Sequence, residues 1–226
     1  MSKKLLLSVC PLLATAGLAL GPPAAQGAPL WHANGPPIPP SPPETPTPVI
    51  AWGTLTLKIV AGGPPGGEVT CHNALAGDVS NPAAGSAGVG EVEELVTAEC
   101  ESSSVCPPSA TGTMVTPESL PWPLELVASG SVIRAKTTGI KLVVECLKGG
   151  TVESAIGFVT NPGSACCKAL QPMFKHGTSA LHPGFVEFDP ASGEVEVEGS
   201  VGAIRAKVEG ELKYLGFTEQ EIINVS

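Results

Sequence analysis

The sequence is poor in aromatic residues, in basic residues and in helical patterns. Phe, Trp and Tyr together make up 4% of the 226 residues, and 12 Lys and Arg stand against 21 Asp and Glu. An acidic chain is repelled by nucleic acid and by anionic lipid, so neither is an expected partner. The one helix-like fragment, 165–170, is short and is stopped by Pro172. These absences favour an all-β protein.

The usual motifs of secreted hydrolases and of zinc enzymes are also missing. The segment 177–181 (GTSAL) lacks the closing glycine of a nucleophile elbow, and the two nearby histidines are six residues apart rather than four. A serine, two histidines and two carboxylates still lie close along the chain, at Ser179, His176, His182, Glu187 and Asp189. A hydrolase that uses this region is the third of our functional hypotheses, after the binding module and the ligand carrier described below. We expect no enzymatic activity and no cofactor.

A row of three glutamates, Glu194, Glu196 and Glu198, is the feature that most resembles a cation site. Alternate side chains of a strand are about 6.6 to 6.8 Å apart, too far to share one calcium ion without oxygens from another segment. We interpret the row as a solvated face that Arg205 and Lys207 neutralise. No metal site is expected.

The N-terminus has the pattern of an export signal. Lys3 and Lys4 precede an apolar run over 5–20, and small residues before Ala28 favour cleavage after Gly27. The run is too short for a membrane span, so we expect no integral span after cleavage. A lipoprotein signal that uses Cys10 is the alternative. The mature chain is expected outside the cell or in the cell envelope.

A proline-rich stretch follows the signal. Residues 36–48 hold eight prolines in thirteen positions, and proline fixes φ and lacks an amide hydrogen. We therefore expect 28–48 to be an extended linker and 49–226 to form one folded domain. Removal of Lys3 and Lys4 lowers the basic count from 12 to 10 against 21 acids, so the mature domain is strongly acidic.

Six cysteines remain once Cys10 is removed with the signal, and an exported chain should pair them as three disulfides. Cys71, Cys100 and Cys146 share the phase of the apolar side of their strands, so we expect them inside, with Cys71–Cys100 as the first pair. Cys106, Cys166 and Cys167 have no such phase. The adjacent Cys166 and Cys167 either bond to each other as a redox switch or each bond elsewhere, and we favour the second reading.

The segment 184–214 carries the clearest β pattern, since apolar and charged residues alternate in three short runs. A hairpin with Ser200 and Val201 at its centre places Glu194 opposite Lys207 and Glu196 opposite Arg205. Opposite charges then meet, and each cross-strand pair contributes on the order of 0.2 to 1 kcal/mol. Val197 should face Ile204 on the dry side of this sheet.

Alternation also predicts strands over 52–60, 68–72, 91–100, 132–136 and 140–146. In 91–100 we place Val92, Val96, Ala98 and Cys100 on one face, with Glu94 as an interruption. The segment 74–90 reads as a long loop or as short strands joined by turns.

Two turns are predicted between the later strands. Thr138-Gly139 should connect 132–136 and 140–146 as a hairpin, although this register sets Lys136 opposite Lys141. The prolines of Leu120-Pro121-Trp122-Pro123 indicate a bend at a sheet edge.

Several short motifs together resemble a group of uncharacterised exported β-rich proteins of high-GC Gram-positive bacteria. The motifs are the Trp-Gly-x-Leu-x-Leu strand at 52–57, Thr70-Cys71, Asn81-Pro82, the Gly-x-Gly at 88–90, Leu120-Pro121-Trp122 and a strand that ends in Cys146. The resemblance implies an exported protein with a β fold. It implies no activity and no functional residue.

We therefore expect one antiparallel β-sandwich or partly closed β-barrel of roughly eight to ten strands, held by disulfides. The leading functional hypothesis is a secreted, non-catalytic binding or envelope-associated module, a monomer with an unknown extracellular or cell-envelope partner. Trp52 and Trp122 are the candidate binding surface.

The alternative is a carrier for a small apolar molecule. A cavity lined by apolar residues of several strands would favour the carrier, and a solid core would favour the module. The residues expected to line it are Leu55, Leu57, Leu142, Val144, Val208 and Leu212.

Overall fold

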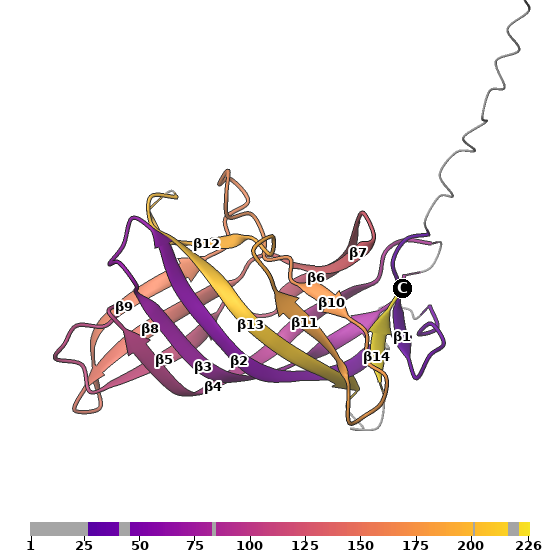
Figure 1. Ribbon diagram of the computed structural model, residues 1–226, viewed down its shortest axis with the longest axis horizontal. Coiled ribbons are helices and arrows are strands. Elements are labelled where there is room, and N and C mark those ends of the chain that lie inside the picture. Colours follow the sequence, from indigo (N-terminus) through magenta and orange to yellow (C-terminus); the bar gives the residue numbers. More distant parts are fainter. Residues whose placement is uncertain (1–26, 41–45, 83–84, 201, 217–221) are drawn as a thin grey trace, which may run out of the picture.

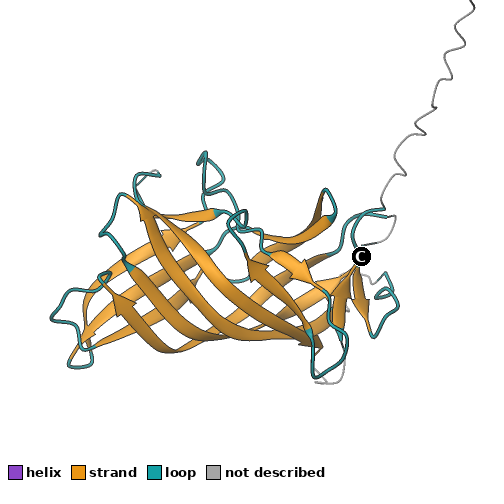
Figure 2. Ribbon diagram, in the orientation of Figure 1, coloured by secondary structure: helices purple, strands orange, loops and turns teal. Residues whose placement is uncertain are grey.

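The computed structural model describes residues 27–40, 46–82, 85–200, 202–216 and 222–226, and within them every regular element is a β-strand (Figure 2). The predicted signal segment up to residue 26 and the predicted turn residue Val201 lie outside the described residues. In the part of the chain that is described, no helix has the length and hydropathy to cross a membrane. The strands are β1 (Trp31–Ala33), β2 (Thr47–Ala61), β3 (Glu68–Ser80), β4 (Val89–Ser103), β5 (Gly112–Glu118), β6 (Trp122–Ser129), β7 (Val132–Thr137), β8 (Lys141–Lys148), β9 (Thr151–Val159), β10 (Met173–Lys175), β11 (Gly184–Phe188), β12 (Glu194–Val197), β13 (Arg205–Gly216) and β14 (Ile223–Val225).

Twelve of these strands form one antiparallel sheet in the order β11-β10-β7-β6-β4-β3-β2-β13-β12-β9-β8-β5. β11 also pairs with β13, which closes the strands from β11 to β13 into a ring. The remaining strands β12, β9, β8 and β5 continue the sheet from β13, toward the end of the elongated molecule that lies away from β1 and β14 (Figure 1). The predicted all-β, antiparallel and partly closed fold is confirmed.

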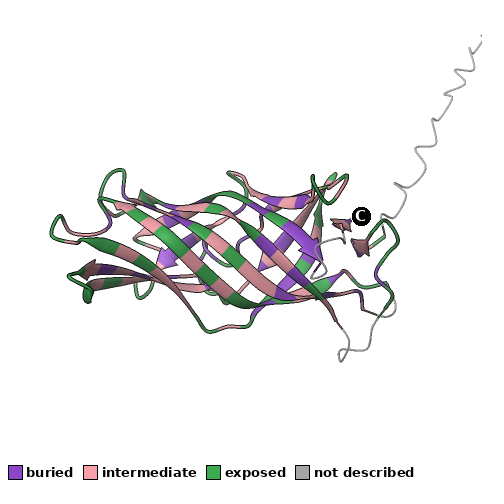
Figure 3. Ribbon diagram, turned by 90° about the horizontal axis from the view of Figure 1, so that it is seen from below, coloured by how far each residue is buried: buried purple, intermediate pink, exposed green. Residues whose placement is uncertain are grey.

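The predicted hairpin register at 184–214 is confirmed. Glu194 pairs with Lys207 and Glu196 with Arg205, and the amide of Val197 donates to the Ile204 carbonyl at 3.0 Å. Alternation along β13 continues beyond this hairpin, so buried and exposed positions succeed each other along the long strands (Figure 3).

The face assignment in β4 was wrong because two bulges interrupt the alternation. Ala76 pairs with Glu94 and Gly77 with Val92, so Glu93 is an extra residue that reverses the faces after it. Val96 is consequently 53% exposed on the outer side.

The second bulge lies at Glu99, which has a φ of +51°, and it turns Cys100 back toward Cys71 inside. The first bulge needs its glycine, because a Cβ on Gly77 would lie 2.0 Å from the Glu91 carbonyl oxygen. The segment 74–90, predicted as a long loop or as short strands joined by turns, contains the second half of the long strand β3 and the start of β4.

The predicted hairpin about Thr138-Gly139 was also wrong. β7 pairs with β6 and β10, whereas β8 pairs with β5 and β9. The two strands diverge, so Lys136 and Lys141 do not meet. Lys136 lies 3.3 Å from Glu125, and Lys141 lies 3.0 Å from both Glu118 and Glu198.

The proline-rich segment is not a free linker over its described part. Trp31 is fully buried and Ile38 is 4% exposed, and β1 pairs with β14. The Asn81 side chain fastens this segment to the sheet, since Oδ1 accepts from the Trp31 amide and Nδ2 donates to the carbonyls of Trp31 and Ile38, each at 2.8 Å. The folded domain therefore begins before the predicted Val49. Residues 41–45 lie outside the described part.

The bend predicted at Leu120–Pro123 is present, with a cis peptide bond between Leu120 and Pro121. It joins β5 to β6. β5 is the last strand of the sheet and β6 is an interior strand between β4 and β7, so the bend directly follows an edge strand, as predicted.

Two groups of buried side chains form the core, one at each end of the molecule. The Trp31 cluster contains Trp31, Ile38, Val49, Ala51, Val79, Leu124, Leu126, Ala135, Phe174, Val186, Leu212, Tyr214, Ile223 and Val225. The Phe158 cluster contains Leu57, Val69, Cys71, Val92, Val105, Trp122, Ile140, Val144, Phe158, Leu170, Val195, Ala206 and Val208.

Three disulfides join the six cysteines. The pair Cys71–Cys100 is the predicted one, and Cys106 bonds to Cys146. Cys166 and Cys167 bond to each other, so the expectation that each bonds elsewhere was wrong. The helix-like fragment 165–170 forms no helix; it runs as bends that end in the bridge between Leu170 and Thr137.

Candidate functional site

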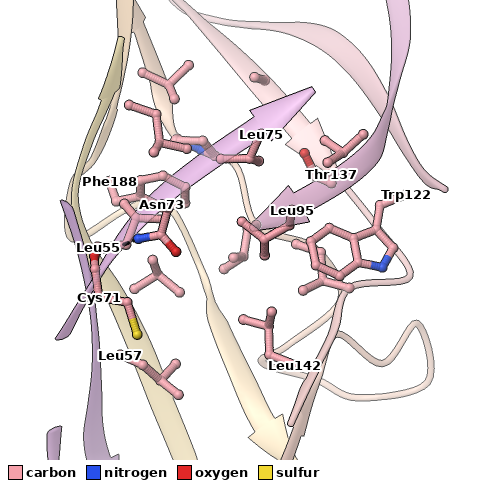
Figure 4. Close-up of a pocket in the computed structure, with 18 of the residues that line it drawn as sticks. Leu55, Leu57, Cys71, Asn73, Leu75, Leu95, Trp122, Thr137, Leu142 and Phe188 are labelled. Atoms are coloured by element: carbon pink, nitrogen blue, oxygen red, sulfur yellow. Dashed lines mark hydrogen bonds between the residues drawn. The ribbon is translucent and has the colours of Figure 1, made fainter. Parts of the chain in front are cut away.

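A cavity of about 100 Å³ lies where the two clusters meet (Figure 4). Leu55, Leu75 and Phe188 pack against both clusters and stand in its wall. β2, β3 and β13 each contribute side chains to both clusters and to the wall of the cavity between them.

The wall is almost entirely apolar and comes from strands on all sides of the ring. Of the residues predicted for a carrier cavity, Leu55, Leu57, Leu142, Val208 and Leu212 line it, whereas Val144 is buried in the Phe158 cluster away from it. The lining residues are Leu55, Leu57, Val69, Cys71, Asn73, Leu75, Val92, Leu95, Val115, Trp122, Leu124, Ala135, Thr137, Ile140, Leu142, Leu170, Pro172, Val186, Phe188, Val208, Leu212 and Tyr214.

Asn73 is the most polar group of the wall. It shares the inward phase of Cys71 and Leu75 on β3, and its side chain lies among the apolar residues of Figure 4. Its Nδ2 donates to the Cys71 carbonyl at 2.7 Å, which fixes the orientation of the amide. The carbonyl oxygen Oδ1 then has no hydrogen-bond donor among the described residues. A free acceptor in an apolar wall favours a ligand with a donor group.

Two hydroxyl groups accompany Asn73. The backbone of Thr137 is satisfied by the N–H and C=O of Leu170, and no described residue bonds to its Oγ1. The Tyr214 hydroxyl also lacks a hydrogen-bond partner among the described side chains and backbone groups, and burial raises the pKa of Tyr214 to about 12. Tyr214 therefore stays neutral and can donate or accept a hydrogen bond.

The wall of the cavity holds few ionisable groups. Cys71 is in a disulfide, and Tyr214 is the one ionisable side chain among the residues that line the cavity. An apolar enclosure with a few convergent polar groups is the usual construction of a small-molecule site.

The predicted hydrolase residues do not form a triad. Ser179 Oγ and His182 Nδ1 are 3.2 Å apart, but both belong to one exposed turn. The carboxylates lie elsewhere, since Glu187 is 3.5 Å from Lys175 and Asp189 is 2.8 Å from Arg134.

The remaining member of that group, His176, faces the ring of Phe174 with a centroid distance of 6.5 Å. The structure thus joins the serine to one histidine and brings no carboxylate to it, within the described residues.

The glutamate row is not one solvated face. Glu194 lies 2.7 Å from Arg205 and Glu198 lies 3.0 Å from Lys141. Glu196 is only 2% exposed, because the loop 160–170 covers it. The sequence interpretation is corrected for this residue.

The two tryptophans proposed as a binding surface lie in different environments. Trp52 is 37% exposed on the outer side of β2 and borders two surface depressions of about 470 and 580 Å³. Trp122 is 4% exposed, donates its indole N–H to the Glu118 carbonyl at 2.9 Å, and lines the cavity. The prediction of a surface role for Trp122 was therefore wrong.

Asn73 and Thr137 were missed because the predicted strands ended one residue too early, at His72 and at Lys136. Extending the alternation by one position in each strand puts both side chains on the inner face. Comparison of the chain with protein-family models, with curated proteins and with solved structures finds no match.

Proposed function

We propose that this exported chain binds a small, mainly apolar molecule in the cavity between its two clusters. The observation that supports the proposal is the apolar enclosure of about 100 Å³, with Asn73 Oδ1 as an acceptor that has no described donor. This cavity is the feature that favours the carrier over the structural module.

The size and chemistry of the wall limit the ligand. An apolar protein cavity of about 150 Å³ holds benzene, so a cavity of this order suits a single small ring or a short branched chain. Asn73 favours a ligand with one O–H or N–H group, and the hydroxyl-bearing residues Thr137 and Tyr214 also line the cavity. A small phenol or alcohol has these properties.

The experiment compares phenol with benzene on the purified chain with its disulfides intact, by titration calorimetry and by ligand-observed NMR. Both should bind, and phenol should bind about three- to tenfold more tightly, because one neutral hydrogen bond contributes about 0.5 to 1.5 kcal/mol. Asn73→Leu should remove this preference while benzene still binds. The proposal fails if neither molecule binds.

A variant that fills the cavity provides the second test of the proposal. Ala135 is 1% exposed and lines the cavity, so Ala135→Leu puts three more carbon atoms into it and should abolish binding of both molecules. Ala128→Leu is the matched control, because Ala128 is exposed on the neighbouring strand β6. Equal binding by the two variants would place the ligand elsewhere.

A second candidate function is the extracellular binding module. The exposed Trp52 between two depressions on the outer side of the sheet supports it. Trp52→Ala should then abolish capture of the partner and leave phenol binding unchanged. Loss of phenol binding in Trp52→Ala would contradict the idea that the surface around Trp52 and the cavity are separate sites.

A further inference from the structure

The Cys166–Cys167 disulfide lies in the loop between β9 and β10, pressed against β12. The backbone N–H of Asn161 donates to the Cys167 carbonyl at 2.7 Å, and Ser164 Oγ lies 3.2 Å from Cys166 Sγ. Cys167 is fully buried and Cys166 is half-buried. This arrangement leaves one sulfur near the surface and fixes the other inside.

A carboxylate from β12 completes a compact group of donors. The two sulfurs and one carboxylate oxygen of Glu194 all lie within 4.8 Å of one another. Arg205 holds the Glu194 carboxylate at 2.7 Å and so limits its rotation. Two thiolates and one carboxylate form a donor set suited to Zn²⁺ or Cd²⁺.

A second, buried carboxylate lies beside this group. Glu196 accepts hydrogen bonds from Asn161 Nδ2 at 2.7 Å and from Ser164 Oγ at 2.9 Å. Both donors are neutral, and no Lys, Arg or His of the described chain forms an ion pair with it. A desolvated carboxylate without a cation favours the arrival of positive charge nearby. Ser164 connects it to Cys166 through one hydroxyl.

We propose that reduction turns this disulfide into a redox-gated site for one thiophilic divalent cation. An external dithiol supplies two electrons and two protons, the Sγ–Sγ bond breaks, and the dithiol closes to its own disulfide. The cation then binds Cys166, Cys167 and Glu194, and the two thiol protons pass to solvent. In the oxidised chain the sulfurs carry no thiolate charge and the site is closed to the metal.

The test uses Cd²⁺ as the probe, because cadmium bound to thiolates has an ultraviolet charge-transfer absorption. The full chain is reduced with dithiothreitol under native conditions, freed of reductant without oxygen, and titrated with Cd²⁺. Reduced wild type should bind one ion per chain with this absorption, and the oxidised protein should bind none. Far-ultraviolet circular dichroism checks that the β structure survives reduction.

The matched control is the double variant C166S/C167S, which keeps the other four cysteines and should bind no cadmium after reduction. Glu194→Gln should keep the absorption but weaken binding at least tenfold, and Glu209→Gln, at an exposed acid of β13, should change nothing.

Three outcomes would overturn the proposal. They are no absorption from reduced wild type, equal cadmium binding by C166S/C167S, or mass mapping that links Cys166 to a cysteine other than Cys167.

Discussion

The two ends of the molecule close the sheet by different means. At the Trp31 end, β10 and β11 complete a ring of backbone hydrogen bonds through the pairing of β11 with β13. At the Phe158 end, β5 is the last strand of the sheet, and among the described strands it pairs with β8 alone. One side-chain hydrogen bond, from Thr97 Oγ1 to the Val115 carbonyl at 2.7 Å, connects β4 to β5 there.

The two cores also differ in what holds them together: aromatic rings at one end and disulfides at the other. The Trp31 cluster contains Trp31, Phe174 and Tyr214, whose rings meet at centroid distances of 5.9 Å, and none of its members is a cysteine. The other end carries the Cys71–Cys100 and Cys106–Cys146 disulfides. At this end no β-ladder of the described sheet joins β4 to β5. The Cys106–Cys146 disulfide instead links the loop after β4 covalently to β8.

The largest effect is expected at the closed end, from Trp31→Ala. Trp31 is fully buried, its ring stacks edge-on against Phe174, and its indole N–H donates to the Val89 carbonyl at 3.0 Å. Its loss should lower the free energy of unfolding by about 3 to 5 kcal/mol in urea titration. Trp52→Ala, at a 37% exposed position, should cost about 1 kcal/mol or less. Equal costs would show that the segment before β2 is not part of the core.

The next effect distinguishes the disulfides. Cys106 and Cys146 are separated by 40 residues, so replacing both by alanine should cost roughly 4 kcal/mol of stability through loop entropy. Cys166 and Cys167 are adjacent, and the same replacement should cost about 1 kcal/mol or less. Thermal and urea unfolding of both double variants give the comparison. A larger loss for the adjacent pair would refute the idea that it does little for stability.

A smaller, pH-dependent effect comes from the ion pair that ties β7 to the end of β11. The hydrogen bond from Arg134 lowers the pKa of Asp189 from 3.8 to about 2. A lowered carboxyl pKa stabilises the fold above the unfolded value, and this stability disappears as the pH falls through the folded value. Asp189→Asn should therefore cost about 2 kcal/mol at neutral pH, with the difference from wild type shrinking between pH 4 and pH 2. A difference that is constant over this range would contradict the assignment.

The smallest effect is expected from Glu125→Gln. Glu125 lies 3.3 Å from Lys136, but its side chain is 51% exposed. Exposed ion pairs contribute about 0 to 1 kcal/mol, so the unfolding free energy should change by about 0.5 kcal/mol or less, and salt should reduce this change further by screening the charges. A change as large as that of Asp189→Asn would mean that exposure does not separate the two ion pairs.

The sequence predicted the alternation within strands and the register of a short hairpin well, but it predicted poorly which strands are neighbours in the sheet. The register of Glu194 with Lys207 followed from charge and alternation across a short turn. The partners of β7 and β8 did not, because any inward-facing strand satisfies the same alternation and only closure of the whole ring selects among them. The bulge at Glu93 was also missed, since an extra residue reverses the faces without changing the composition of the strand.

The candidate site shows the same division. Five of the six residues proposed for a carrier cavity do line it, because inward phase is readable from a strand. The cavity stays open because the two clusters pack separately on either side of it. The pattern of a single strand does not predict this.

The amino-acid order alone determined that the chain is built of antiparallel strands, and which side of most strands is dry, because a period of two is a local geometric property. The tertiary structure decided which strands are neighbours and that Glu196 is buried. These depend on contacts between residues far apart in the chain, which are made only when the ring closes.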